Sequence, residues 1–557
     1  MPFLIIVSVI IIGLLIRGVF LSKKKRLALY NSFKTGFGKI KTKKYRFGRS
    51  HRNAVLKRFS ADNVIDDITW NDLDMEAVFE RIDSCKSAVG EEYLYFLLHS
   101  ESIGKEGEEF DKLVSNLSGD ERTRTDLLFS LNRLGYIKEY SPFDYLDNLT
   151  VHKGGIPVRH IIFDLLFIPL IALLFYRALW GGIGIFLLLV INILLYFKDK
   201  NALGGLFESL GFIVRLSRES LNLINSNIKL PSEYMAQISE NTRFLKRLKN
   251  RGIYLAASGQ GANGGSPVEI ILTYLNMVFH FDLIEYDLML KDLSGKKNLL
   301  ENMLLLFGRL DSAISVADFR TSMGDNWCKP EFIDYVKGDE TKVKLLIKDG
   351  IHPLVDNYVP SSIDAKRGIL LTGSNASGKS TFLRMVAINS VLAQTVYTVC
   401  AHEYEAPVFN IFSSIALRDD LRSRESYFMV EIGSLKRIID ADTTKNPVLC
   451  FIDEVLRGTN TVERISASNA ILRYFASENI LAFAATHDGE LADLLSDVMD
   501  NYHFGENVSD QDVSFDYKIK SGKADTRNAI RLLKSYGYPE AIVNESEKMA
   551  QILDAKG

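Results

Sequence analysis

A glycine-rich loop at residues 373–381 combines the residue types and the spacing that phosphate binding requires. It follows the pattern G-x-x-x-x-G-K-[ST] and consists of Gly373, Ser374, Asn375, Ala376, Ser377, Gly378, Lys379, Ser380 and Thr381. The glycines let the backbone curl, so that successive N–H groups face phosphate oxygens. Lys379 would reach the β- and γ-phosphates of a nucleotide, and the Ser380 hydroxyl would ligate Mg²⁺. We therefore expect this loop to bind ATP with Mg²⁺.

Two other groups of polar residues follow apolar segments further along the chain. Residues 448–452 precede Asp453 and Glu454, and residues 480–486 precede His487. An acid at the end of a strand that follows a phosphate loop can hold Mg²⁺, so Asp453 joins Ser380 as an expected metal ligand. Glu454 is then placed to polarise the attacking water, and His487 to contact the γ-phosphate or that water. A structural histidine is the alternative interpretation of His487.

The elements that must position these side chains are those of an α/β domain. Residues 369–371 predict a buried parallel strand before the loop, and a helical pattern begins near Lys379. From residue 343 onward, strand-like and helical segments alternate. We expect a C-terminal α/β P-loop domain over residues 345–557. A chance glycine-rich turn is the competing interpretation, and the strand before the loop and the helix after it argue against that interpretation.

The sequence before this domain favours helices. Apolar residues recur at helical spacing over residues 73–100, where Gly90 breaks the pattern and predicts that one helix gives way to another. Residues 201–344 are again mostly helical in pattern. A basic cluster at residues 243–251 leads into a glycine-rich loop at 259–265. We interpret this cluster as a solvated helix face, with nucleic-acid binding as the alternative.

The first apolar segment, residues 3–21, is long enough to cross a bilayer and is interrupted only by Arg17. Basic residues follow it, at 23–26, whereas a cleaved signal peptide carries its basic residues first. We therefore predict a retained transmembrane anchor at 1–22. The positive-inside rule then places the chain after residue 22 in the cytoplasm.

The second apolar segment, residues 161–197, carries only Asp164 and Arg177 as charged residues. Trp180, Gly181 and Gly182 predict a turn mid-way, and so a transmembrane hairpin. A buried helical hairpin of a soluble protein is the alternative. We expect a multi-pass protein of the inner or plasma membrane with a cytoplasmic ATPase domain.

The overall charge does not indicate a class of binding partner, but the charge of the N-terminal region does. The 557 residues have a net charge of −2 and are 47% hydrophobic. Every charged residue before Asp62 is Lys or Arg, so residues 23–60 form a basic juxtamembrane linker. We expect residues 23–58 to contact anionic lipid headgroups, with nucleic acid as the alternative. The four cysteines lie far apart without metal-ligand spacing, which favours a reducing cytosolic compartment and cysteines that serve as small core residues.

Four motifs together resemble the ATPase domain of the MutS mismatch-repair family. They are TGSNASGKSTFLR, SRESYFMVEI at 423–432, FIDEVLRGTNT at 451–461 and ATHD, in the order and spacing of that family. DGIHPLV at 349–355 resembles the entry into that domain, and RNAIRLLKSYGYPEAIVNESEKM resembles its closing helical segment. Residues 61–344 are similar to the helical core and lever region of the family, most clearly at SAVGEEYLYFLL.

The resemblance implies an ATPase of the ABC superfamily that works as a homodimer, with nucleotide held between two subunits. Ser426 would then lie in the loop that reaches the γ-phosphate of the partner subunit, and the closing helical segment would support dimerisation. Glu431 and Arg457 match neighbouring family motifs, and we assign them no separate chemistry. The expected fold is a mainly α N-terminal and central region with transmembrane helices, followed by an ABC-type α/β ATPase domain.

The chain also departs from the family pattern. Mismatch readers of the family use a Phe-x-Glu element in an N-terminal domain, whereas F-x-E occurs here at residues 504–506, inside the ATPase region. The anchor and basic linker occupy the sequence before Leu73, so we expect neither a mismatch-reading nor a connector domain there. Two functions remain open. The first is a membrane-tethered, DNA-repair-related ATPase that grips duplex DNA. The second is a membrane-associated mechanochemical ATPase that acts on an unknown protein partner without a DNA role.

Overall fold

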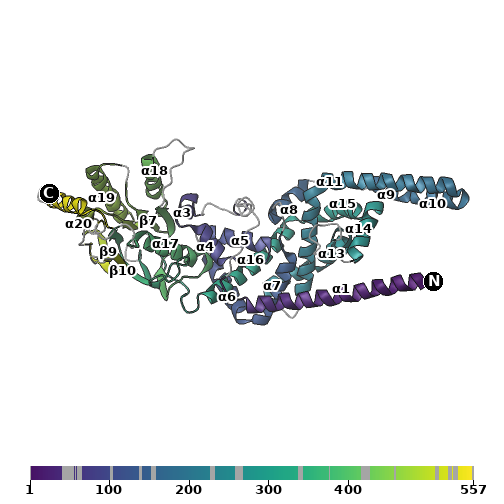
Figure 1. Cartoon of the computed structure of the whole chain (residues 1–557), viewed down its shortest axis with the longest axis horizontal. Coiled ribbons are helices and arrows are strands. Elements are labelled where there is room, and N and C mark those ends of the chain that lie inside the picture. Colours follow the sequence, from purple (N-terminus) through teal and green to yellow (C-terminus); the bar gives the residue numbers. More distant parts are fainter. Residues whose placement is uncertain are drawn as a thin grey trace. The chain divides into compact units, whose positions relative to one another are not determined.

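The chain forms two compact units in a computed structural model (Figure 1). The first comprises Met1–Phe59, Asp83–Phe96 and Leu113–Asp318, and the second Ser60–Ile82, Leu97–Lys112 and Phe319–Gly557. The structure describes residues 2–40, 56, 58, 65–100, 104–136, 141–151, 158–225, 232–256, 267–335, 343–374, 377–415, 427–456, 459–478, 480–508, 513–524, 530, 533 and 537–554.

The first unit is built from helices, as the sequence pattern predicts. These are α1 (Pro2–Thr35), α7 (Glu121–Leu134), α8 (Pro142–Val151), α9 (Val158–Leu165), α10 (Phe167–Tyr176), α11 (Ala178–Ile224), α12 (Ser232–Glu240), α13 (Thr242–Ala256), α14 (Pro267–Phe279) and α15 (Phe281–Leu293). Three helices, α5 (Ala88–His99), α6 (Gly104–Gly119) and α16 (Lys297–Ser322), have residues in both units.

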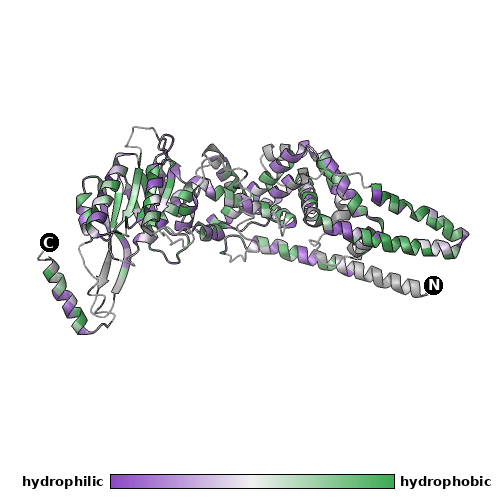
Figure 2. Cartoon of the chain, turned by 90° about the horizontal axis from the view of Figure 1, so that it is seen from above, coloured by the Kyte–Doolittle hydropathy of each residue, from purple (hydrophilic) through white to green (hydrophobic). Residues whose placement is uncertain are grey.

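An apolar helical hairpin extends from the first unit (Figures 1 and 2). Helices α9 and α10 form one arm, and the first part of α11 forms the other. The two segments long and apolar enough to cross a membrane are Val158–Tyr176 and Ala178–Leu203, of 19 and 26 residues. Only 11% and 17% of their most apolar windows are buried, whereas the core helix of a soluble protein is mostly buried. Among the described residues, length and composition thus allow two spans, both in this hairpin.

The turn of the hairpin lies at Arg177, and the expectation of a turn at residues 180–182 is wrong. Arg177 leaves helical geometry at φ −139°, and α11 begins at Ala178 and runs through both glycines. A Cβ at Gly181 would overlap backbone atoms of Leu174, and one at Gly184 would lie 2.7 Å from a methyl carbon of Leu170. Small residues let apolar helices approach closely, so these glycines serve the contact between the arms.

The first part of the basic segment after the expected anchor is helical, and it packs on another helix of the first unit. Helix α1 continues without a break to Thr35, so the beginning of the expected linker at 23–60 is helix. Its C-terminal part packs on α7, where Lys34 pairs with Glu121 at 2.6 Å and the Arg26 guanidinium lies 4.9 Å from the Phe129 ring centre. The side chains of residues 2–16, most of the expected anchor, lie outside the described residues.

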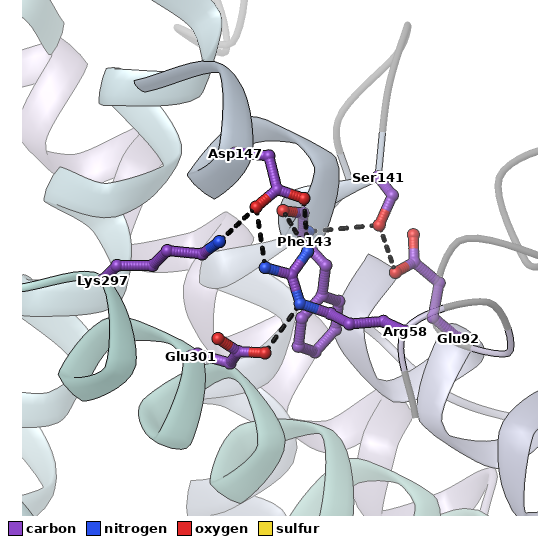
Figure 3. A network of polar contacts seen from close by, with 7 residues as sticks. All are labelled: Arg58, Glu92, Ser141, Phe143, Asp147, Lys297 and Glu301. Carbon is purple, nitrogen blue, oxygen red and sulfur yellow. Dashed lines mark hydrogen bonds and ion pairs between the residues drawn. The ribbon is translucent and has the colours of Figure 1, made fainter. Parts of the chain in front are cut away.

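Arg58, at the end of the segment expected to face lipid, lies in an internal network (Figure 3). Its guanidinium donates two hydrogen bonds to Asp147, at 2.7 and 2.9 Å, and one to Glu301 at 2.6 Å. Lys297 reaches the same Asp147 carboxylate at 2.5 Å. The hydrogen bonds from Arg58 hold the pKa of Asp147 below its usual range. The Arg58 side chain is 16% exposed, so the expectation of a lipid contact is wrong at this residue.

The position of Gly90 is also a correction to the sequence analysis. The preceding helix, α4 (Met75–Ile82), ends well before Gly90, which lies in the first turn of α5. A Cβ at Gly90 would overlap the carboxylate of Asp311 from α16. This carboxylate accepts the backbone N–H groups of Lys86 and Ser87, at 3.0 and 2.8 Å, and so satisfies donors at the start of the helix. The glycine makes room for this cap.

The second unit contains two β-sheets. One has the strand order β10-β9-β4-β8-β7-β6, and β9, β4, β8, β7 and β6 are parallel. The other has the order β1-β5-β2-β3. The strands are β1 (Glu331–Phe332), β2 (Leu345–Gly350), β3 (Ser361–Ala365), β4 (Gly368–Thr372), β5 (Glu403–Ala406), β6 (Asn410–Ser414), β7 (Val448–Asp453), β8 (Ile480–Ala485), β9 (Met499–Val508) and β10 (Val513–Ser521). The helices are α3 (Asp67–Asp72), α4, α17 (Lys379–Val396), α18 (Tyr427–Ile439), α19 (Thr461–Ser477), α20 (Gly489–Leu494) and α22 (Glu540–Asp554).

The division of the chain at residue 345 does not match the compact units. Residues 60–82 and 97–112, expected in the helical region, belong to the same unit as the sheets. Helix α3 packs on β6, and the Asp72 carboxylate accepts hydrogen bonds from the Ser413 hydroxyl and the Ile415 N–H, both at 2.8 Å. The backbone carbonyl of Asp72 accepts a third from Arg384 at 2.9 Å. The two bonds to the carboxylate satisfy polar groups of the edge strand β6 and of the residue after it, and their partner lies far away in the sequence.

Candidate nucleotide-binding site

The phosphate-loop residues lie between a buried central strand and the first turn of a helix. All five residues of β4 are buried, and β4 pairs in parallel with β8 on one side and β9 on the other. The chain then passes Gly373 and Ser374, and α17 begins at Lys379 with Gly378 as its N-cap. Asn375 and Ala376 lie outside the described residues. The strand–loop–helix order is the one predicted, and it directs the positive end of α17 toward the loop.

Both glycines of the motif have a backbone conformation that other residues rarely adopt. Gly373 has φ +138° and Gly378 has φ +112°. A Cβ at Gly373 would also lie 3.2 Å from the carbonyl oxygen of Phe504 and 3.2 Å from the Ser377 hydroxyl. This hydroxyl is fully buried and has no hydrogen-bond partner among the described residues. A curled backbone with a buried, unsatisfied donor fits a phosphate group.

Lys379 lies across the inside of the loop. Its ammonium donates hydrogen bonds to the carbonyl oxygens of Gly373 and Ser374, at 2.7 and 2.8 Å, and the residue is 4% exposed. The carbonyls thus hold a buried cation within the loop that is expected to receive phosphate. Thr381 follows in the first turn of α17 and is half-buried.

The two residues predicted to ligate Mg²⁺ are in contact. The Ser380 hydroxyl on α17 donates a hydrogen bond to a carboxylate oxygen of Asp453, the last residue of β7. Within the described part of the chain, no group of three or more His, Cys, Asp or Glu side chains is placed to hold a metal. One hydroxyl and one carboxylate fit Mg²⁺, which keeps several waters and shares phosphate oxygens in nucleotide sites.

The two residues predicted to act on water also meet. His487 Nε2 lies 2.5 Å from Glu454 Oε1, and both side chains are partly exposed, at 33% and 23%. Glu454 follows β7 and has φ +60°, and its N–H donates to the Ala485 carbonyl at the end of β8 at 2.9 Å. Because β4, β7 and β8 are parallel, Ser380, Asp453, Glu454 and His487 come together at one edge of the sheet. Their roles in binding and catalysis remain predictions.

Two supporting residues were not assigned a role from the sequence. Glu431 on α18 is 2% exposed, and its carboxylate accepts the N–H of Leu456, which has φ +60°. It therefore holds the strained turn that follows Glu454. Arg464 on α19 donates two hydrogen bonds to Asp488, at 2.8 and 2.9 Å, and so fixes the residue after His487. No spacing rule connects either residue to its partner. Ser426 and Arg457 lie outside the described residues.

The comparisons with known proteins agree with the motifs of this site. Residues 369–554 match the family model described as MutS domain V. The comparisons support the MutS family. A "DNA mismatch repair protein MutS" of Lactobacillus acidophilus is 32% identical over 288 residues, which are 49% of this chain and 33% of that protein. The protein of the same name from Clostridium novyi is 34% identical over 227 residues, 38% of this chain and 25% of its own.

A third relative gives the same result. The "DNA mismatch repair protein MutS" of Natronomonas pharaonis is 32% identical over 227 residues, 39% of this chain and 26% of that protein. The chain thus spans about a third or less of the length of these MutS relatives. The similarity supports the MutS-like assignment of the C-terminal part, and the function of the whole chain is a separate question.

Proposed function

We propose that this chain is a MutS-like, Mg²⁺-dependent ATPase that works as a homodimer. The observation that carries the proposal is the contact of Ser380 with Asp453 next to the contact of Glu454 with His487. Bound ATP and Mg²⁺ would supply a phosphoryl group activated for attack by water. The chain would supply Lys379 and the loop N–H groups to hold the phosphates, Ser380 and Asp453 to hold the metal, and Glu454 to accept a proton from water.

The C-terminal helix supports the dimer in this proposal. On α22, Ile542, Met549 and Ile552 are 46%, 48% and 49% exposed. Their spacing places them along one side of the helix, because seven residues complete nearly two turns. An exposed apolar stripe on an amphipathic helix is typical of a helix that packs against a partner. Ser426 is proposed to reach the γ-phosphate in the site of the partner subunit.

Replacement of the loop lysine tests the nucleotide site. We expect Lys379→Ala to lose most ATP affinity, because the cation that faces the phosphates is removed. The matched control is Lys366→Ala, which removes a largely exposed lysine close to the start of β4. Binding of a fluorescent ATP analogue and the thermal unfolding midpoint would be measured for both variants. A folded Lys379→Ala protein that binds ATP as the wild type does would refute the site.

We further propose that the hairpin tethers the ATPase to a membrane as a multi-pass protein with a cytoplasmic ATPase. The proposal is supported by the low burial of its two apolar arms and by the charges at their base. Arg159 pairs with Asp199, and Lys198 and Lys200 flank this pair at the end away from the turn. An excess of basic residues marks the cytoplasmic side of a span.

Duplex DNA is the first candidate substrate of this tethered ATPase, in a DNA-repair-related role. The relatives are named for DNA mismatch repair, which supports this candidate. The alternative is a mechanochemical ATPase that acts on a protein partner. One observation favours it: on α13, Arg251 pairs with Glu285 and Asp292, at 3.2 and 3.0 Å, and Arg247 lies 3.6 Å from Asp292. Part of the basic cluster that would suit DNA is therefore neutralised internally.

Duplex binding by the detergent-solubilised protein at several salt concentrations separates the two candidates. Phosphate contacts release counterions, so a DNA-binding protein should lose affinity steeply as salt rises. Competition between perfect and mismatched duplexes at one salt concentration then measures specificity. We expect equal competition, because phosphate contacts carry no sequence information. A preference for the mismatch of about tenfold, roughly 1.4 kcal/mol, would indicate a mismatch reader. Absence of binding would favour the protein-directed ATPase.

A further inference from the structure

Helix α14, which follows the basic helix α13, presents an apolar face beside the hairpin. Its exposed side chains include Ile271, Tyr274 and Leu275, at 59%, 66% and 38% exposure. These residues are spaced i, i+3 and i+4, so they share one face of the helix. No Asp, Glu, Lys or Arg occurs between Glu269 and Asp282. An uncharged face of this kind in contact with water would be costly.

The same helix is fixed to both arms of the hairpin. It packs against α9 and α11, and the Phe279 ring lies 5.5 Å from the Phe167 ring of α10. The exposed side chains of α14 therefore belong to the same helix group as the exposed apolar side chains of the arms, among them Ile162, Leu165 and Ile168. Figure 2 shows the apolar character of the arms.

A buried polar side chain of the hairpin, Asn192, finds a hydrogen-bond partner on α14. Asn192 is fully buried and donates a hydrogen bond to the carbonyl oxygen of Val278, near the end of α14, at 2.9 Å. His280 Nε2 lies 3.0 Å from the backbone carbonyl oxygen of Asn192. A helix end leaves carbonyl groups without intrahelical partners, and lipid offers none. The hairpin and α14 thus supply hydrogen-bond partners for each other's polar groups at a point where lipid could supply none.

The depth of this contact agrees with an interfacial position. Asn192 precedes Lys198 by six residues, which corresponds to roughly 9 Å along the helix at about 1.5 Å per residue. Lys198, Asp199 and Lys200 mark the water-facing end of the arm if it spans a membrane. Amphipathic interfacial helices lie about 5–10 Å into the boundary between headgroups and acyl chains. Tyr274 also suits this boundary, because its ring is apolar and its hydroxyl is polar.

We propose that α14 is a third membrane-contacting element, an interfacial helix that places Ile271, Tyr274 and Leu275 among the acyl chains of the cytoplasmic leaflet. The proposal rests on the membrane tether proposed above. It gives the tether a broad base, because two spans and a helix at their foot meet the same leaflet. ATP-driven motion of the chain would then be anchored in the membrane by α14 as well as by the two arms of the hairpin.

Fluorescence quenching by labelled lipids tests this position. The full chain would be reconstituted in vesicles that contain lipid with a quencher at carbon 5 or carbon 12 of the acyl chain. A fluorophore would be attached to Tyr274→Cys, with Leu187→Cys on the hairpin and Lys249→Cys on the exposed side of α13 as controls. Wild-type protein serves as the blank. Burial raises the pKa of the Cys328 and Cys400 thiols to about 11 and about 12, so native thiols label slowly.

We expect quenching at Tyr274→Cys at least about twofold above that at Lys249→Cys, and stronger from carbon 5 than from carbon 12, because the helix lies near the headgroups. Leu187→Cys should be quenched more strongly from carbon 12. Quenching at Tyr274→Cys equal to that at Lys249→Cys, with Leu187→Cys quenched, would overturn the proposal and leave the tether standing. Disulfide-linked dimers of the unlabelled Tyr274→Cys protein after mild oxidation, with no lipid quenching of the labelled protein, would identify a second copy as the occupant and also overturn it. Unquenched Leu187→Cys would refute the tether itself, and the proposal with it.

Discussion

At the scale of single residues, the contact between Glu454 and His487 joins two strand ends. Glu454 is held in a left-handed conformation by its bond to the Ala485 carbonyl, and Glu431 holds the turn that follows. A left-handed conformation at a non-glycine residue costs free energy, and such strain is concentrated at functional sites. This strain fits a residue whose carboxylate has to be held in a fixed orientation toward His487.

The first residue-scale prediction separates nucleotide binding from turnover. Glu454→Gln keeps the shape of the side chain and removes its ability to accept a proton. We expect ATP binding to be retained and hydrolysis to slow by about 100-fold or more, in the range of general-base contributions. Glu490→Gln, an exposed acid on α20, is the matched control. Wild-type turnover by Glu454→Gln would exclude Glu454 from the mechanism.

The second residue-scale prediction concerns the pKa of His352 in the DGIHPLV motif. The residue is buried, and its Nδ1 accepts the Leu354 N–H at 3.3 Å. Burial, with a smaller effect of Arg384, lowers the pKa of His352 to about 4. Because the pKa is lower in the folded than in the unfolded chain, the stabilisation is present above about pH 6.5 and is lost as the pH falls toward 4.

Thermal and chemical unfolding at several pH values test this prediction. Between pH 7 and pH 4.5, the wild type should lose about 2 kcal/mol more stability than His352→Asn, which keeps an acceptor for the Leu354 N–H but does not titrate. Parallel pH profiles of the two proteins would show that His352 does not titrate as a buried neutral histidine.

At the scale of elements, the start of α5 depends on an acid from a distant helix. Burial raises the pKa of Asp311 to about 6, while the bonds from Ser87 and Lys86 favour its charged form. The carboxylate caps α5 only because Gly90 has no side chain to displace it. A glycine in a helix would otherwise lower stability by up to about 1 kcal/mol relative to alanine.

Alanine substitutions at two helical glycines test this explanation. Gly90→Ala should destabilise the protein by about 1–3 kcal/mol, because the new methyl group overlaps the Asp311 carboxylate. Gly119→Ala, whose methyl group meets no atom within 4 Å, should be neutral or slightly stabilising. Unfolding midpoints of the full chain in detergent would be compared. Equal effects at the two sites would show that the Asp311 contact does not require a glycine.

At the scale of the whole molecule, the proposed membrane tether requires that the hairpin spans the bilayer. We expect the full chain, and a variant without residues 1–22, to stay in the membrane fraction at high salt and in carbonate. Electrostatic attraction to headgroups is screened within about 8–10 Å at physiological salt, so a protein held by basic residues alone would be released. Release of the shortened variant by carbonate would show that the hairpin does not span the bilayer.

Features that short, contiguous stretches encode can be predicted from the sequence alone. The phosphate loop is an example, because the strand, the two glycines and Lys379 adjoin one another and their geometry follows from local backbone preferences. The parallel strands β7, which ends in Asp453, and β8, which precedes His487, can also be predicted, because apolar runs followed by polar residues have few other interpretations. The helical character of the first unit followed from periodicity in the same way.

The distant residues that these elements need become known only from the three-dimensional packing. The local pattern predicts breaks at Gly90 and Gly181, but each glycine makes room for atoms of another helix, the Asp311 side chain and the Leu174 backbone, which no local pattern indicates. Asp72 satisfies groups of β6, and Asn192 satisfies the end of α14. A buried polar group needs a partner, but its own neighbours in the sequence do not say which one. That choice is made only when packing brings the elements together.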